Sequence, residues 1–408
     1  MEDILRIDED VEFDNSIARY QHHIITPQTG NNFDPLSKIT LEFSNLNVST
    51  LPSESYLYLE GTFLEVKTKK LPTNSRISNN GFAFLFDEAR YNIHGVEIDR
   101  TRNVGMTSTM KNYVSLSPSE SEAMVNAGWD PENDHDSCVD ADGDFSVCIP
   151  LRTIFGFCED YNRLLVHARQ EFTLLRGSDD KNCYEIVDST KTAEDCTIKL
   201  THVSWRLPFV IPAPKPNLDI LHKIEKGRRI RLAYRSWELF EWPQLPSSNT
   251  QVWSIKTTTE LEKPRYVIVG FQTGRKGSQS KCASEFDHCN LSDIKLYINE
   301  EVYPYENLNI DYGKNHFSIL FDMFSKFRKS YYGKGVKPLI QPSTFKSKAP
   351  LAVIDCSKQN DTLKSGPVNF RLEFKSSANF PASTAAFALV IHDRIVEYNL
   401  LDNTVNKL

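Results

Sequence analysis

Apolar and polar residues alternate in short runs along most of this chain, and the runs are rich in β-branched and aromatic residues. Clusters of Pro, Gly, Asn and Ser separate the runs. A half-buried β-strand has this period of two, so each run predicts a strand. A first series of predicted strands occupies residues 38–48, 55–66, 81–93, 95–99, 144–157, 162–175 and 197–211. A second series occupies residues 228–242, 250–257, 264–273, 293–299, 349–356, 368–374 and 385–398.

Between the two series, the chain is rich in proline. Pro208, Pro212, Pro214 and Pro216 lie within ten residues of one another. Proline fixes the backbone angle φ and favours extended conformations, so we expect an extended connector over about residues 208–217.

Two segments have helical rather than strand patterning, one in each series. In the first, Ser117 can cap a helix that begins at Pro118, and Glu120 completes a capping box. Gly128 then ends this helix. The second predicted helix carries apolar residues at spacings of three and four along one face, namely Phe317, Leu320, Phe321, Phe324 and Phe327.

Several landmarks occur twice in the same order. The segment RYNIHGVEID at residues 90–99 resembles KLYINEEVYPY at 295–305, with Tyr91 and Val96 spaced as Tyr297 and Val302 are. Three further pairs are YLYLEG at 56–61 with YVIVGF at 266–271, Pro150-Leu151 with Pro350-Leu351, and residues 169–172 with 371–374. Because order and offset are nearly constant, we infer an internal duplication.

The duplication leads to a fold class. Each copy supplies seven or eight strands and one helix, with connections too short and too rich in strands for a regular alternation of parallel strands and helices. We therefore predict an all-β protein of two tandem eight-stranded antiparallel jelly rolls, each with a short helix. The first jelly roll is placed at residues 1–212 and the second at residues 213–408.

Composition narrows the class of partner. The chain has 408 residues, with 47 Lys and Arg against 54 Asp and Glu, and its net charge of −7 argues against binding nucleic acid through bulk charge. The N-terminal stretch MEDILRIDEDVEFD is itself acidic. No apolar run approaches the roughly 20 residues that span a bilayer, and no signal segment opens the chain. We expect a soluble protein without a membrane segment that is made inside the cell.

The eight cysteines are scattered singly and include no Cys-x-x-Cys pair, so we expect reduced thiols. The acidic loop from Asp134 to Phe145 resembles a calcium loop at first sight. An EF-hand loop that starts at Asp140 needs Gly at its sixth position and Glu at its twelfth, which here are Phe145 and Leu151. We predict a solvated loop over Asp134–Asp144 and leave open a calcium contact between subunits.

Other candidate ligands also lack metal-binding spacing. Cys282, His288 and Cys289 are close in sequence but not in a Cys-x-x-Cys or His-x3-5-His arrangement. His22-His23 and His392 have no partner at such spacing. The sequence motifs of the common hydrolases, nucleotide-binding proteins and zinc proteases do not occur either. We predict no catalytic residue, no cofactor and no metal ligand, and a protein that is not an enzyme.

Two basic stretches remain, KIEKGRRIR at Lys223–Arg231 and KFRKSYYGKGVK at Lys326–Lys337. The second places cations beside Tyr331 and Tyr332, as surfaces that bind single-stranded nucleic acid do. A solvated helix end has the same composition, because basic residues suit the C-terminal end of a helix dipole. We favour the helix end.

Several of these segments together resemble a known family. They are residues 81–100, NVGMTSTMKNY at 103–113, IKLYINEEVYPY at 294–305 and the closing ALVIHDRIVEYN at 388–399. The combination is similar to the double jelly-roll major capsid proteins, above all those of Polinton or Maverick elements, adintoviruses and related virus-derived insertions.

This resemblance implies a capsid subunit located in the virion. Three chains of such proteins form a pseudo-hexagonal capsomer, and capsomers tile an icosahedral shell around double-stranded DNA. The implied partners are further copies of the chain, as homotrimer and then lattice, penton or minor capsid proteins, and packaged DNA through weak contacts only. The acidic N-terminus departs from this pattern because it lacks a basic arm, which puts contact with the genome by that segment in doubt.

Two alternatives stay open at the level of sequence. Jelly rolls also serve as lectins, so a monomeric carbohydrate- or peptide-binding protein is the first alternative. Trp237, Trp242 and Trp253 could stack on sugars, although in strands we expect their rings in the core. A metalloenzyme of two cupin domains is the second, and it would need clustered His and Glu ligands that the sequence does not offer.

Overall fold

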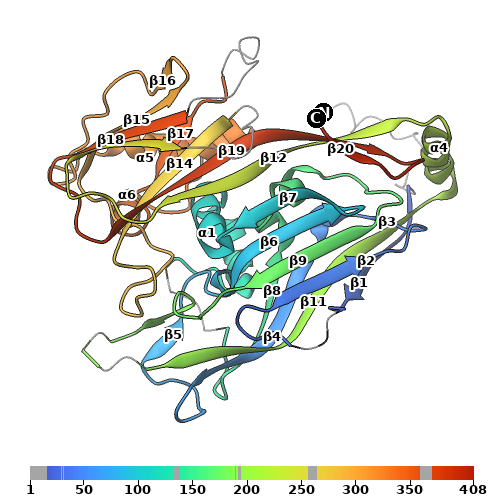
Figure 1. Ribbon diagram of the computed structural model, residues 1–408, viewed down its shortest axis with the longest axis horizontal. Helices are drawn as coiled ribbons and strands as arrows, with labels where there is room; N and C mark the ends of the chain where they lie inside the picture. The colour runs from blue at the N-terminus through green and yellow to red at the C-terminus, as the bar shows by residue number, and fades with distance from the viewer. Residues whose placement is uncertain are drawn as a thin grey trace, which may run out of the picture.

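Two pairs of antiparallel sheets, one pair after the other along the chain, make up the structure (Figure 1). The computed structural model describes residues 16–28, 30, 32–132, 138–188, 190–191, 194–255, 264–358 and 370–408. The first sheet of the first pair contains, in spatial order, β1 (Ile17–Ile25), β11 (Cys196–Pro212), β4 (Tyr56–Glu65) and β8 (Asp144–Pro150), with β3 (Ser49–Thr50) also paired to β11. Its second sheet contains β2 (Lys38–Phe43), β9 (Gln170–Arg176), β6 (Phe86–Ile93) and β7 (Val96–Arg102). A separate small sheet joins β5 (Ser75–Ile77) to β10 (Tyr184–Ile186).

The second pair repeats this arrangement. One sheet contains β12 (Arg229–Trp242), β19 (Thr384–Asn399), β14 (Pro264–Thr273) and β17 (Ala352–Asp355), with β20 (Val405–Lys407) beside β19. The other contains β13 (Thr250–Ile255), β18 (Phe370–Ser376), β15 (Leu291–Ile298) and β16 (Glu301–Tyr303).

The strand order identifies the fold. If the eight main strands of each pair that lie in the described residues are numbered along the chain, both pairs have one sheet in the order 1-8-3-6 and one in the order 2-7-4-5. This is the double Greek key of a jelly roll. The prediction of two tandem eight-stranded jelly rolls is confirmed. The sheets of β1 to β11 are called the first roll below, and those of β12 to β20 the second roll.

Alternating side chains build the core of each roll. In β2, the buried residues are Ile39, Leu41 and Phe43, and the residues between them are exposed or half-buried. Facing sheets then meet through rings, as Phe172 of β9 does with Trp205 of β11 at a centroid distance of 5.9 Å. The same contact recurs in the second roll between Phe271 and Phe374, at 5.1 Å.

The expectation of one helix in each roll is wrong. Both predicted helices exist: the capping box of Ser117 and Glu120 opens α2 (Pro118–Ala123), and α5 (Ser318–Tyr332) buries the predicted apolar face. The described residues also contain α1 (Val104–Ser115), α3 (Gly156–Asp160), α4 (Pro214–Glu225), α6 (Pro342–Lys348) and the short 3-10 turns η2 (Pro52–Glu54), η3 (Ala83–Leu85), η4 (Met124–Ala127) and η5 (Leu151–Thr153). Every residue of α1 is buried, the polar Lys111 and Asn112 included, so polarity does not mark an exposed side in this helix as it does in a surface helix.

The extended connector over residues 208–217 is also only half right. Pro208 and Pro212 belong to β11, but Pro214 opens α4. Proline is favoured in the first turn of a helix because no intrahelical hydrogen bond needs its missing N–H there. Pro212 therefore ends β11, and Pro214 begins α4.

The two matching hairpins are equivalent elements, but their residues were aligned one position out of register. The first hairpin, β6–β7, turns at His94 and Gly95, and the second, β15–β16, turns between Ile298 and Glu301. Ile93 therefore corresponds to Ile298, and Tyr91 to Leu296. A shift of one residue reverses the side of a strand, so Tyr91 lies in the core whereas Tyr297 points outward against Arg371.

The Pro-Leu landmark was a chance match. Pro150 ends β8, whereas Pro350 precedes β17. In the ladders, Tyr56 pairs with Pro150 and Tyr266 pairs with Asp355. The duplication thus rests on the equal order of the strands and not on this pair.

The register correction makes a prediction about the two tyrosines. Tyr91→Ala should lower the free energy of unfolding by about 3–5 kcal/mol, because it opens a cavity in the first roll and removes the hydrogen bond from the tyrosine hydroxyl to Gln170. Tyr297→Ala should cost less than about 1 kcal/mol, since only a half-buried ring over a guanidinium is lost. Denaturant unfolding followed by intrinsic fluorescence measures both. Equal losses would contradict the register.

Candidate functional site: the junction between the rolls

The junction begins where β12, the first strand of the second roll, runs beside β7 of the first roll (Figure 1). Side chains rather than a backbone ladder join the two strands. The hydroxyl of Tyr234 donates to the carbonyl of Ile98, and Arg394 of the neighbouring β19 donates to the same carbonyl at 3.2 Å. A carbonyl at the free edge of one roll is thus satisfied by the other roll.

Asp99 joins three elements at this edge. Its carboxylate, which is fully buried on β7, accepts from the hydroxyl of Ser236 at 2.6 Å and from the backbone N–H of Phe157 at 2.9 Å. Burial raises the pKa of Asp99, and these two hydrogen bonds oppose the rise. β7, α3 and β12 therefore meet at one buried carboxyl group.

A buried lysine lies at the centre of the junction. The side chain of Lys111, on α1, is 1% exposed, and its Nζ lies 2.7 Å from Oε1 of Glu159, 2.8 Å from the hydroxyl of Ser115 and 2.8 Å from the hydroxyl of Tyr332. An ammonium group has three protons, and each of them has an acceptor here. Burial lowers the pKa of Lys111, and the Glu159 carboxylate opposes that shift.

Aromatic rings of the second roll surround this ammonium group. The Nζ of Lys111 lies 4.7 Å from the ring centre of Trp237 and 4.5 Å from that of Tyr331. The hydroxyl of Tyr331 donates to Glu159 at 2.7 Å. Cation–π attraction and charged hydrogen bonds therefore act together across the two rolls.

A second ion pair lies beside the first. Arg235 of β12 makes a two-pronged contact with Asp160, from Nε at 2.7 Å and from Nη2 at 2.6 Å, and its guanidinium lies 3.4 Å from the ring centre of Tyr331. Burial alone would lower the pKa of Arg235, but the hydrogen bonds to Asp160 outweigh it and raise the pKa. Because the pair is planar and bidentate, it fixes the orientation of β12 as well as its distance.

Gly156 lets these groups come together. A Cβ atom at this position would lie 1.7 Å from the carbonyl oxygen of Arg235, so the start of α3 packs directly on the backbone of β12. Any larger residue would push α3, and with it Glu159 and Asp160, away from the second roll.

A third contact fastens α2 to α5. Nη1 of Arg328 donates to Glu120 at 2.7 Å and to the carbonyl of Ser115 at 3.0 Å, and Lys334 approaches Glu120 at 3.3 Å. Burial alone would raise the pKa of Glu120, but the backbone N–H of Ser117 and the guanidinium of Arg328 outweigh it, so that the pKa falls to about 2. Within KFRKSYYGKGVK, Arg328, Tyr331 and Tyr332 thus belong to the junction.

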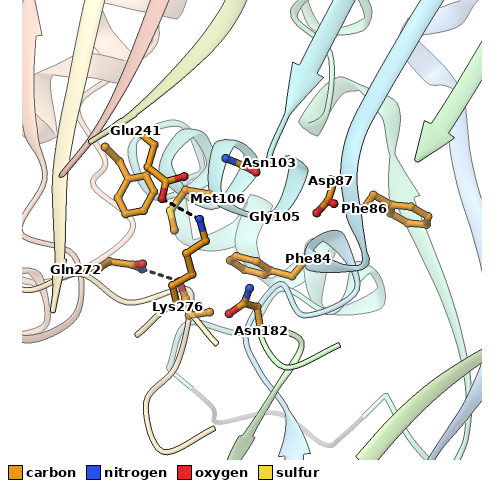
Figure 2. A pocket seen from close by; sticks show the side chains of 12 residues that line it. Phe84, Phe86, Asp87, Asn103, Gly105, Met106, Asn182, Glu241, Gln272 and Lys276 are labelled. Atoms are coloured by element: carbon orange, nitrogen blue, oxygen red, sulfur yellow. Dashed lines mark hydrogen bonds and ion pairs between the residues drawn. The ribbon is translucent and has the colours of Figure 1, made fainter. Parts of the chain in front are cut away.

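Two openings lie at the junction, and the smaller of them suits water better than a substrate. Phe84 and Gly105 of the first roll and Gln272 of the second line a crevice of about 60 Å³. It lies beside the ion pair of Lys276 with Glu241 (Figure 2). That volume holds only a few water molecules. A larger cleft of about 460 Å³ adjoins Lys111, and both Lys111 and Lys334 in its lining are paired with carboxylates of the chain.

The predicted acidic loop lies only partly in the described residues. Residues 134–137 fall outside them, and Asp140 accepts hydrogen bonds from the backbone N–H groups of Asp142 and Asp144 of its own loop. This carboxylate therefore orders the loop. A calcium contact over Asp134–Asp144 stays untested.

The structure does not gather the cysteine and histidine candidates. Cys282 contacts Ser284, His288 stacks on Tyr312, and Cys289 contacts Thr273. In the described part of the chain, no three His, Cys, Asp or Glu side chains come together as metal ligands. All eight cysteines lie in that part, and no disulfide bond joins any two of them. The absence of catalytic, cofactor and metal residues stays a prediction.

The remaining candidate residues make structural contacts. His23 stacks on Phe209, and His392 is buried in β19. Arg229 and Arg231, in the first basic stretch, pair with Glu397. Trp237 is buried in the junction, whereas Trp242 and Trp253 are half-buried and pack on each other at 5.9 Å. Among the described helices, none is long and apolar enough to cross a membrane.

Sequence reasoning missed Lys111, Glu159, Asp160 and Asp99. Asp99 and Lys111 are ordinary charged residues in segments assigned to a strand or to the family pattern, and Glu159 and Asp160 lie between two predicted strands. One signal was available: Lys111 lies in an otherwise uncharged stretch, NVGMTSTMKNY, where a lysine needs an acidic partner. The partner itself could not be named, because Glu159 is far away in sequence.

The match to a protein family agrees with the observed fold. A family model described as a double jelly roll-like domain matches residues 75–396. The search of curated proteins found no match.

Three solved structures share the fold over nearly the whole chain. PBCV-1 VP54, fitted into a reconstruction of the virophage Sputnik, is 10% identical, with 98% of each chain covered and a TM-score of 0.61. A chain of the Sputnik virophage structure is 9% identical, with 100% of this chain and 92% of that chain covered and a TM-score of 0.63. The mavirus major capsid protein is 11% identical, with 99% and 92% covered and a TM-score of 0.57.

Removal of the central cation should weaken the junction. Lys111→Met leaves Glu159 buried without its counter-charge and should lower the free energy of unfolding by about 3–5 kcal/mol. Lys326→Met is the matched control: it breaks an exposed ion pair with Asp322 and should cost at most about 1 kcal/mol. The double variant Lys111→Met/Glu159→Gln should recover part of the loss. Thermal melting decides, and a loss no larger than that of the control would count against a central role for Lys111.

A buried histidine makes stability depend on pH. Burial lowers the pKa of His392 to about 4, and Arg394 adds to this shift, whereas the unfolded chain has the ordinary value near 6.5. Below about pH 6.5 the unfolded state therefore binds more protons, so stability should fall progressively down to about pH 4, by up to about 3 kcal/mol. The free energy of unfolding is measured for the wild type and for His392→Gln at pH 7 and pH 4. Because the variant lacks the buried imidazole, its stability should fall less between the two pH values than that of the wild type. The same loss in both proteins would show that His392 is not its source.

Proposed function

This chain belongs to the double jelly roll-like domain family, and from that premise we propose that it is the major capsid protein of an icosahedral viral or virus-like shell. The observation that carries the proposal is the pair of rolls with equal strand order, held as one unit by the buried junction around Lys111. A shell subunit needs such rigidity, because movement of one roll relative to the other would disturb the contacts between neighbouring subunits. The shared fold with the mavirus major capsid protein supports the same function.

We propose that three copies form the capsomer. One chain offers two similar rolls, so three chains around a threefold axis present six similar rolls, which suit a hexagonal lattice. Each contact in such a ring joins two different faces of the chain, and a threefold rotation closes it without a free face. The partners are then further copies of the chain and, at the vertices of the shell, penton or minor capsid proteins, and the protein is located in the virion.

Contacts with packaged double-stranded DNA are proposed to be weak. The net charge is −7, and the junction takes up Arg328, Tyr331 and Tyr332 of the stretch with the best pattern for nucleic acid. We also propose the division of the chain into residues 1–212 and 213–408, which assigns α4 to the second roll.

Little in the structure favours the alternative, a monomeric carbohydrate-binding protein. Of its three candidate tryptophans, Trp237 is buried against Lys111, where no sugar can reach it. Trp242 and Trp253 pack on each other.

Light scattering coupled to size exclusion tests the proposed function. Three chains of 46.7 kDa give a mass of about 140 kDa, and we expect this species or larger particles. Because each chain carries a net charge of −7, added salt should screen the repulsion between capsomers and favour particles, which electron microscopy would show. A monomer at every salt and protein concentration would refute the capsid function and favour the carbohydrate-binding alternative.

A further inference from the structure

The junction inside the chain has a donor side and a receiver side. On the donor side, β12 is the end strand of its sheet, and it sends Trp237 towards Lys111 of α1 and Tyr234 against Phe157 of α3, at 5.4 Å. On the receiver side, the first roll offers β7 and the helices α1 and α3 that follow β7 and β8. The first strand of one roll thus fills the hollow beside the fifth and sixth strands of the other.

The second roll has a receiver side of its own, and it is open. A hollow of about 480 Å³ lies between the end of β16, α5 and β17, which are the counterparts of β7, α1 and β8. Its lining is largely apolar and includes Tyr303, Tyr305, Ile319 and Met323. Tyr305 is 87% exposed and Ile319 is 56% exposed, which is unusual for two neighbouring large apolar groups unless another surface covers them.

The first roll has a matching donor side. β1 is the counterpart of β12 and the end strand of its sheet. Tyr20, His22 and Ile24 alternate along one face, and Tyr20 and Ile24 are 45% and 56% exposed, while His23 on the other face stacks on Phe209 of the roll. In β12, the alternate residues Arg235 and Trp237 make the contacts with the aromatic rings and Lys111.

We infer that β1 of one copy docks in the hollow between β16, α5 and β17 of a second copy, with Tyr20 and Ile24 against Ile319 and Tyr305. β1 and β16 lie at opposite ends of the molecule, so they cannot meet within one chain (Figure 1). The contact joins two different faces, as the junction does, and a threefold rotation between copies closes contacts of this kind into a ring. The inference rests on the proposed self-assembly and names the surfaces that perform it.

The apolar side chains, rather than charge, carry this pairing. The lining of the hollow has the carboxylates of Glu306, Asp322 and Asp355 and the single cation Lys326. Arg19 of β1 is exposed, but in the alternation of the strand it shares the face of His23 and not that of Tyr20 and Ile24.

Two variants that each remove one face test the inference. Tyr20→Asp/Ile24→Asp damages the donor strand, and Tyr305→Asp/Ile319→Asp damages the hollow. Val187→Asp, at a site 60% exposed outside both surfaces, is the matched control. In light scattering, each double variant alone should fall from the mass of three chains to that of one, and the control should keep three.

Mixing the two double variants gives the sharper result. Each retains the face that the other has lost, so the mixture should form a two-chain species that neither variant forms alone. A contact between two identical faces could not produce a two-chain species that appears only in the mixture. Hydrogen exchange on the wild type gives a second readout without any substitution: amides of β1 and of residues 303–308 should gain protection when dilute protein assembles.

The outcomes separate the two proposals. If the wild type and both double variants form trimers, or if the mixture stays monomeric, or if assembly leaves the exchange of β1 unchanged, this docking is wrong and the capsid function stands. If the wild type never assembles, the proposed function itself is wrong, and this inference falls with it.

Discussion

The structure depends on one buried positive charge, the ammonium group of Lys111. An unpaired charge in this position would cost several kcal/mol, so the fold must bring acceptors to it from elements that are far apart in sequence. Glu159 comes from α3, which follows β8, and Tyr332 from the helix after β16, and the rings of Trp237 and Tyr331 close the remaining sides. These partners can assemble only when the two rolls lie in one relative position. The lysine thus links the folding of each roll to their mutual orientation.

The two rolls share a strand order but use it differently. In the first roll, the helix after the repeated hairpin, α1, is wholly buried, because the second roll covers it. In the second roll, the corresponding α5 buries one face and leaves Ile319 exposed on another. Each roll also begins with an end strand, of which β12 is engaged and β1 is open. A duplicated unit in tandem necessarily has one pair of such faces joined inside the chain and one pair left outside.

Prediction from sequence worked where a signal was local and failed where the answer lay in a neighbour. The capping box at Ser117 and the apolar face of α5 need only adjacent residues, and both were correct. The tyrosine match between hairpins was wrong by one residue, because turn length fixes the register and similar letters do not. α1 was missed because the second roll buries its polar residues too, so that its apolar residues do not stand out as a single buried face. Arg328, Tyr331 and Tyr332 looked like a surface pattern, and only their contacts with Glu120 and Glu159 show that they are interior.

The sequence by itself determined that the protein is all-β, that it is duplicated and that each copy is a jelly roll. The period of two and the repeated order of strands are properties of the chain, and few folds accommodate them. The tertiary structure alone decided which charged residues are buried and which faces of the rolls remain open. The physical reason is that a charge such as that of Lys111 or Asp99 is read as a surface group until its partners are known, and those partners lie tens or hundreds of residues away. Their proximity is a consequence of packing, which no local pattern records.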